Sequence, residues 1–205
     1  ESINVTEKIY QTLKLAAYES SVEIAEELGS FKDYDSKVEE NCEFIQLIKF
    51  ERPDLYKKMI KFGRRNIALT TTAPTGTVSI MAQTSSGIEP VFNLSYKRRK
   101  KINPNDKDSK IDFIDQNGDS WQEFIVYHPK LSTWMSVSGI DNIKKSPWDG
   151  CCAEDLDWND RVKLQSIAQR HIDHAISSTI NLPTDVSVKE VKKIKKEFTD
   201  FVSGE

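Results

Sequence analysis

The stretch TTTAPTGTVSIMAQTSSGIEP, residues 70–90, joins a β-branched run to a short apolar run through a turn at Pro74. The residues NIALTT just before the turn predict a buried strand from about Ile67 to Thr72. The residues after the turn predict a short helix that starts near Thr77 and closes at Gly87. Hydroxyls and small residues therefore gather where a strand ends and a helix begins.

This turn has the composition of an anion-binding site. The first N–H groups of a helix have no acceptor within the helix, and the positive end of the helix dipole lies behind them. Gly76 allows an anion to approach the backbone, and Thr75, Thr77 and Ser79 offer hydroxyls. The turn holds no Lys or Arg and lacks the Gly-Lys-Ser/Thr of a Walker loop. The alternative is a well-capped helix after a strand, in which the threonine hydroxyls make their hydrogen bonds among themselves and bind no ligand.

Helices are predicted before this strand. Ile9, Leu13, Ala16, Ala17, Ser20 and Ile24 recur with helical spacing and favour a helix over Thr6–Leu28, with Thr6 as N-cap and Gly29 as the stop. A second helix is expected over Ser36–Phe50. A third, from Pro53 to Phe62, is ended by Gly63.

The residues after Phe92 predict a loop and a hairpin up to Tyr127, with Asn117-Gly118 as the hairpin turn. A short helix is expected over Pro129–Val137. An apolar stripe then favours a helix from Asp157 to about Ser178, followed by an extended exit through TINLP. A final helix is expected from about Val188 to Phe201.

Composition sets bounds on the class of protein. The 205 residues are 38% hydrophobic and 30% charged. This composition predicts a small hydrophobic core and a surface of which part packs against another chain or segment. The net charge of −3 does not favour nucleic acid overall, and no apolar run approaches the roughly 20 residues that span a bilayer. The start at Glu1, with no signal-peptide pattern, is expected of a piece of a longer chain.

Three cysteines form neither a metal-binding spacing nor a secreted disulfide framework, so a reducing cytoplasm is the expected location. They are Cys42, Cys151 and Cys152. The adjacent pair Cys151–Cys152 could suggest redox chemistry. Buried or tolerated thiols are the favoured interpretation, because neighbouring residues form a disulfide only with strain.

Two stretches resemble the large chain of the ribonucleotide reductase family, closest to its adenosylcobalamin-dependent class II branch. They are APTGTVSIMAQTSSGIEPVFNLSYKRR and RVKLQSIAQRHIDHAISSTINLP, and the resemblance extends over roughly Thr6–Glu190. It implies an α/β fold, the C-terminal half of a ten-stranded reductase barrel with N-terminal helices and an inserted β-hairpin. It also implies that the turn holds the substrate's phosphates, through Thr75, Gly76, Thr77, Val78 and Ser79.

Within the implied fold, residues 1–205 form one fragment of the barrel domain. Its parts are a helical segment 1–63, a strand-turn-helix phosphate site 64–92, a loop and hairpin excursion 93–128, and helices with a final extended segment 129–205.

Parts of the family pattern are missing. The Asn-x-Cys-x-Glu finger loop that carries the radical cysteine is absent, as are the reducing cysteine pair and the closing GxxxYRDG strand. The resemblance therefore implies no catalytic residue in this chain, and we expect no activity from the chain alone. The complete enzyme would use adenosylcobalamin and a ribonucleotide substrate, and would need the N-terminal half of the reductase as partner.

Three other features have both a functional and a structural interpretation. Glu89 could act as an acid or base, but a carboxylate that ties down a turn is favoured. His171 and His174, on either side of Asp173, have a spacing that metal sites use, but core and rim histidines are favoured over a metal. The basic run Lys97–Lys101 could contact nucleic acid, but a solvated loop or an acidic partner surface is favoured.

Two further function classes stay open. The chain could be a non-catalytic module that binds nucleotide phosphate, or an inactive fragment. It could also bind nucleic acid through Lys97–Lys101, with the strong salt dependence typical of such binding.

Overall fold

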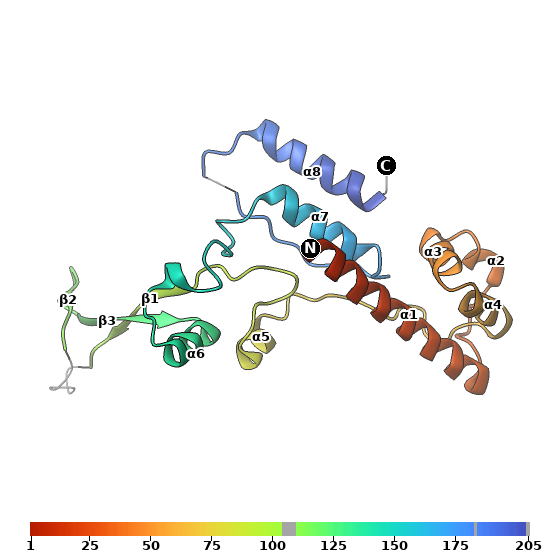
Figure 1. Cartoon of the computed structure of the whole chain (residues 1–205), viewed down its shortest axis with the longest axis horizontal. Helices are drawn as coiled ribbons and strands as arrows, with labels where there is room; N and C mark the ends of the chain where they lie inside the picture. Colours follow the sequence, from red (N-terminus) through yellow and green to blue (C-terminus); the bar gives the residue numbers. More distant parts are fainter. Residues whose placement is uncertain (104–109, 183, 204–205) are drawn as a thin grey trace. The chain divides into compact units, whose positions relative to one another are not determined.

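The structure is a computed structural model, and it describes residues 1–103, 110–182 and 184–203. The chain divides into two compact units, one formed by Glu1–Pro74 with Asp157–Glu205 and the other by Thr75–Leu156. Figure 1 shows helices in both units and a small sheet in the second. Among the described residues, no helix is both long and apolar enough to cross a membrane. The elements present agree with the predicted α/β class.

The first unit is helical. Its core lies between α1 and the short helices that follow, and consists of Tyr18, Val22, Ile45, Ile48, Leu55, Tyr56 and Met59. The helices are α1 (Ser2–Leu28), α2 (Ser36–Glu39), α3 (Glu43–Glu51), α4 (Pro53–Phe62), α7 (Trp158–Gln169) and α8 (Val188–Ser203).

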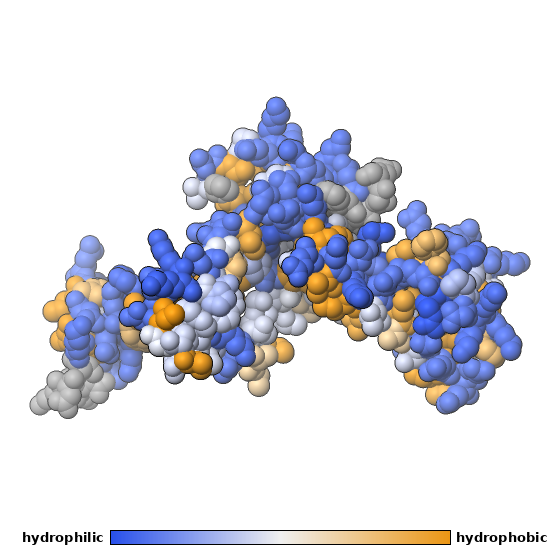
Figure 2. Space-filling view, viewed as in Figure 1, coloured by the Kyte–Doolittle hydropathy of each residue, from blue (hydrophilic) through white to orange (hydrophobic). Residues whose placement is uncertain are grey.

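The buried face of helix α1 is not the apolar face that the spacing of its hydrophobic residues predicts. The buried positions are Lys14, Tyr18, Ser21, Val22 and Ala25. The apolar stripe instead faces outward, with exposed fractions of 51% at Val5, 59% at Ile9 and 50% at Leu13, and it continues to Ile24 and Leu28. Figure 2 shows hydrophobic side chains gathered over the N-terminal half of this helix. We call Val5, Ile9, Leu13, Ile24 and Leu28 the α1 stripe.

Two helix predictions in the N-terminal part are corrected. Helix α1 begins at Ser2 with Glu1 in the cap position, so Thr6 is inside the helix and the predicted N-cap is wrong. The predicted helix Ser36–Phe50 is two helices, α2 and α3. At the break, the Asn41 side-chain amide donates to the Lys37 carbonyl and that of Gln46 to the Glu40 carbonyl, which satisfies carbonyls that a continuous helix would pair.

The predicted helix from Asp157 to Ser178 is wrong beyond Gln169, where α7 ends. The Gln169 side chain replaces the next helical turn. Its Nε2 donates to the carbonyls of Ile172 and His174, and its Oε1 accepts from the Ile176 N–H. The apolar stripe therefore continues on an extended segment.

The predicted buried strand Ile67–Thr72 is also corrected. Ile67 is 67% exposed, and the segment forms a single parallel bridge, between Thr72 and Ile176. The carboxylate of Asp173 takes the place of a ladder, since it accepts the N–H groups of Leu69 and Thr70, each at 2.8 Å. Two backbone bonds also link the segments, from the His174 N–H to the Thr70 carbonyl and from the Ser177 N–H to the Thr72 carbonyl, each at 3.2 Å.

The second unit contains α5 (Gly76–Ala82), α6 (Pro129–Ser138), the 3₁₀ turn η1 (Ile143–Lys145) and an antiparallel sheet in the order β1-β3-β2. The strands are β1 (Ser95–Lys101), β2 (Phe113–Ile114) and β3 (Ser120–Tyr127). The predicted hairpin at Asn117-Gly118 is confirmed: β2 and β3 pair around it, and Gly118 has φ +82°. Residues 104–109, part of the loop predicted after Phe92, lie outside the described residues.

The basic run Lys97–Lys101 lies on β1, so its placement in a loop is wrong. It pairs along its whole length with β3, from Lys97 opposite Ile125 to Lys101 opposite Trp121. Because side chains alternate along a strand, the run is divided between the two faces of the sheet.

Candidate functional site

The turn after Pro74 leaves backbone donors free. Helix α5 starts at Gly76, and its first internal bond runs from the Ser79 N–H to the Thr75 carbonyl at 2.9 Å. Among the described residues, no acceptor pairs with the N–H groups of Gly76, Thr77 or Val78. All three residues are exposed. Three adjacent amides are therefore available to an anion.

Thr75 holds the turn in a strained conformation. Its φ of 23° and ψ of 37° place a β-branched residue in the left-handed region, which costs on the order of 1–3 kcal/mol. Its hydroxyl accepts a hydrogen bond from the Gly87 N–H at 3.2 Å. This bond joins the PTGT turn to the SSGIEP segment, so the two halves of the sequence motif form one local structure.

Ser79 has a structural role in the turn. Its side chain is 8% exposed, and its hydroxyl donates to the Gly76 carbonyl at 2.7 Å. Since its N–H is bonded to Thr75, Ser79 has no free donor. Of the five residues predicted to contact phosphate, Gly76, Thr77 and Val78 offer free amides, whereas Thr75 and Ser79 shape the turn.

The space in front of Gly76 is open. A Cβ built on Gly76 would meet no atom within 4 Å, and Gly76 does not have positive φ. The protein therefore accepts a side chain here without a clash. A requirement for glycine at this position would have to come from a bound ligand.

Helix α5 is short and apolar on its outer surface. It has seven residues, so its macrodipole is small. The positive potential at the turn therefore comes mainly from the three free amides. Its exposed side chains include Val78 at 63%, Ile80 at 78% and Met81 at 81%. These side chains do not pack into the core of the second unit.

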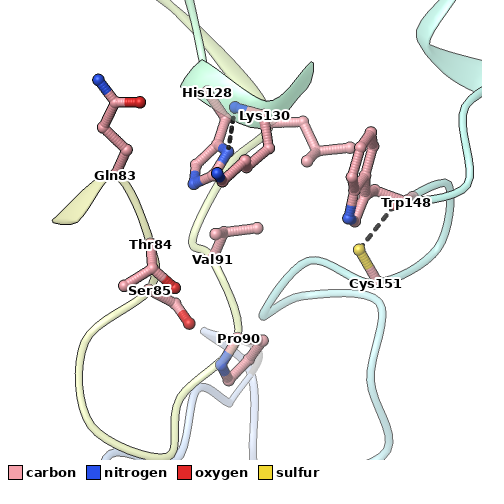
Figure 3. A pocket seen from close by; sticks show the side chains of 10 residues that line it. Gln83, Thr84, Ser85, Pro90, Val91, His128, Lys130, Trp148 and Cys151 are labelled. Carbon is pink, nitrogen blue, oxygen red and sulfur yellow. Dashed lines mark hydrogen bonds between the residues drawn. The ribbon is translucent and has the colours of Figure 1, made fainter. Parts of the chain in front are cut away.

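A cavity of about 250 Å³ lies at the other end of α5. Figure 3 shows His128 and Lys130 on one side of it, Thr84 and Ser85 on another, and Trp148 beside Cys151. The remaining lining residues are Gln83, Pro90, Val91 and Leu94, so neither a carboxylate nor any of the five turn residues lines it. The sequence analysis did not predict this cavity. One of its lining residues, His128, is recognisable as a helix cap before Pro129, and its Nδ1 accepts the Lys130 N–H at the start of α6.

The cysteines do not have the character of redox groups. Cys151 and Cys152 are free thiols, and Cys151 Sγ donates to the Trp148 carbonyl at 2.8 Å. Burial raises the pKa of both thiols above the ordinary value. Both therefore stay protonated at neutral pH and are poor nucleophiles.

The other polar candidates are Glu89, His171 and His174. The Glu89 N–H closes a turn onto the Ser86 carbonyl at 3.2 Å. His171 is 2% exposed with neither ring nitrogen bonded, and burial lowers its pKa, so it is neutral. His174 is exposed on the extended segment. Within the described part of the chain, no three His, Cys, Asp or Glu side chains gather as metal ligands.

Comparison with known proteins agrees with the motif and the fold. The family model described as "Ribonucleotide reductase, barrel domain" matches residues 1–197. The chain therefore belongs to the ribonucleotide reductase family, as part of its barrel domain. This confirms the resemblance that the two sequence stretches indicated.

The similar proteins include B12-dependent members of the family. The "Vitamin B12-dependent ribonucleoside-diphosphate reductase" of Mycobacterium tuberculosis is 26% identical over 95% of this chain and 25% of its own length. The protein of the same name from Thermoplasma acidophilum is 27% identical over 98% of this chain and 24% of its own. The "Vitamin B12-dependent ribonucleotide reductase" of Rhodopirellula baltica is 29% identical over 64% of this chain. The chain spans about a quarter of the length of the first two relatives.

Proposed function

We propose that this chain is the part of a B12-dependent ribonucleotide reductase that binds the phosphates of the ribonucleotide substrate. Two observations support the proposal: membership of the reductase family and the three free amides of Gly76, Thr77 and Val78 at an open turn. The complete enzyme would convert ribonucleotides to deoxyribonucleotides in the cytoplasm. This chain would form part of its α/β barrel.

The amides would bind phosphate oxygens directly. Backbone N–H groups are fixed in direction, so they bind an anion without the entropy cost of ordering long side chains. The Thr77 hydroxyl, on an exposed residue with no partner in the described structure, would add one more donor. Thr75 and Ser79 would keep the amides pointed at the ligand through their bonds to Gly87 and Gly76.

The cavity of the second unit is too small to hold cobalamin. The cavity in the second unit has about 250 Å³, which is far smaller than a corrin ring with its nucleotide tail. If the complete enzyme uses adenosylcobalamin, other parts of the reductase would hold it.

The remainder of the reductase would pack on the α1 stripe. The relatives are about four times as long as the aligned region, and the stripe exposes five large apolar side chains along one helix. Covering these partly exposed side chains would favour association, since full burial of a large aliphatic side chain contributes about 1.5–3 kcal/mol. We therefore propose that the chain acts as one part of a longer or split enzyme and is inactive alone.

Coexpression with the rest of the reductase tests this partner. The wild-type chain should copurify with it and restore reduction of ribonucleoside diphosphate, whereas the chain alone should show no turnover. Leu13→Glu should lower the affinity of association at least about tenfold, because it places a charge in the buried contact. Glu26→Gln, exposed on α1 but outside the stripe, should leave association unchanged. Equal association by both variants would contradict the docking site.

A further inference from the structure

The basic run on β1 is divided into two faces with different charge balance. Lys97 and Arg99 share Glu123 on β3, at 3.8 and 2.9 Å, and Arg99 also lies over the Phe113 ring. Lys101 pairs with Asp119. The cations on this face are therefore compensated by carboxylates within the sheet.

Within the described residues, the cations of the opposite face form no ion pair with a carboxylate. The cross-strand neighbours of Arg98 and Lys100 are Phe124 and Gln122, and both cations are exposed. In the part of the chain that the structure describes, neither cation forms an ion pair. We call this side of the sheet the open face. It is defined by Tyr96, Arg98, Lys100, Gln122 and Phe124.

Two aromatic rings lie on the open face beside the cations. Tyr96 is 53% exposed and Phe124 is 39% exposed. Tyr96, Arg98 and Lys100 follow one another at two-residue intervals along β1, so successive positions lie about 6.6 Å apart along the strand. Tyr96, Arg98 and Lys100 therefore form an exposed row of one ring and two cations, with Phe124 opposite Arg98.

From this arrangement we propose that the open face binds single-stranded nucleic acid. Arg98 and Lys100 contact two backbone phosphates, while Phe124 and Tyr96 stack against bases. This combination of a cationic track and aromatic platforms is the one that sequence-tolerant single-strand binding uses. An acidic polypeptide would pair with the two cations but would offer the two exposed rings nothing to stack against. The sheet, rather than a loop, supplies the flat surface that stacking needs.

The number of contacts predicts the strength and the salt dependence of binding. Each neutralised phosphate of a single strand contributes about −0.7 to the slope of log affinity against log salt, so two contacts predict a slope near −1.4. Such a small number of contacts, on a chain of net charge −3, gives weak binding that is measurable only at low salt.

A fluorescence anisotropy titration with a labelled twelve-residue oligothymidylate, from about 20 to 200 mM salt, tests the proposal. The double variant Arg98→Gln/Lys100→Gln should lose at least about tenfold in affinity, and its slope should fall toward zero. Phe124→Leu should weaken binding about fivefold with the slope unchanged, because stacking releases no counterions. The double variant Lys97→Gln/Arg99→Gln removes the same charge from the compensated face and should stay within about twofold of wild type.

Several results would overturn the proposal. They are no binding at 20 mM salt, equal losses in the two double variants, or tighter binding of polyglutamate than of the oligonucleotide. Far-ultraviolet circular dichroism of each variant shows whether the sheet has formed. The test needs no reductase activity, so the proposed function and this inference fail separately.

Discussion

Replacing Asp173 with alanine should destabilise the first unit by about 3–5 kcal/mol. The Asp173 carboxylate accepts four hydrogen bonds, from the Leu69 and Thr70 N–H groups, the Thr70 hydroxyl and the Tyr18 hydroxyl. Tyr18 is 1% exposed and Thr70 is 7% exposed, so their donors would be left buried without an acceptor. Urea unfolding followed by circular dichroism measures the loss. Asp160→Ala, on exposed α7 surface, is the matched control and should change stability by less than about 0.5 kcal/mol.

The same carboxylate should give the first unit an acid-dependent stability. Burial by itself raises the pKa of Asp173, but the N–H groups of Thr70 and Leu69 outweigh it, and the net pKa lies below the ordinary value of 3.8. A lowered pKa means that the contribution to stability is complete above about pH 5 and is lost as the pH falls through the folded pKa. Asp173→Asn should remove this part of the dependence between about pH 2 and 5. Parallel pH profiles for the wild-type chain and Asp173→Asn would show that the carboxylate does not have this role.

Replacing Gly76 with aspartate should lower affinity for a ribonucleoside diphosphate by about 30- to 150-fold. A carboxylate placed next to bound phosphates costs roughly 2–3 kcal/mol in like-charge repulsion. The folded chain itself has room for the new side chain, since a Cβ at Gly76 meets no atom within 4 Å. Isothermal titration calorimetry with cytidine diphosphate measures the dissociation constants of the wild-type chain and the variant.

Controls separate the contact from general charge and from the fold. Ser136→Asp adds the same charge on the exposed surface of another helix, α6, and should leave affinity within about twofold, because an exposed charge outside the turn is screened. Thr77→Val removes one hydroxyl at constant shape and should cost about 1 kcal/mol, or fivefold. If Gly76→Asp and Ser136→Asp bind equally well, the turn is not the phosphate site.

Local signals predicted the elements that local chemistry defines. Asn117-Gly118 fixed the hairpin because only a few residues adopt the required turn conformation, and Pro53 with Gly63 marked both ends of α4. The turn after Pro74 was also predicted from its residues, since free amides follow from where a helix starts. The predicted strand before the turn, Ile67–Thr72, was wrong, because that segment forms one bridge rather than a ladder.

Tertiary context decided the elements that sequence alone misassigned. The stripe from Leu164 to Ile176 has helical spacing, yet Gln169 and Asp173 supply side-chain hydrogen bonds that hold the second part extended. The spacing of the apolar residues predicted the helix α1 correctly. It did not predict which face is buried, because periodicity identifies an apolar face but not what packs against it. The open face of the sheet could not be foreseen either, since it depends on which residues of β3 lie opposite Arg98 and Lys100.

The most direct test of phosphate binding is a nitrogen-15 NMR titration of the whole chain with cytidine diphosphate, with cytidine as the reference ligand. We expect the diphosphate, and not cytidine, to shift the backbone amide signals of Gly76, Thr77 and Val78, and Gly76→Asp to abolish the shifts. Signals of these three amides that stay unchanged at saturating diphosphate, or that move equally with cytidine, would contradict the account.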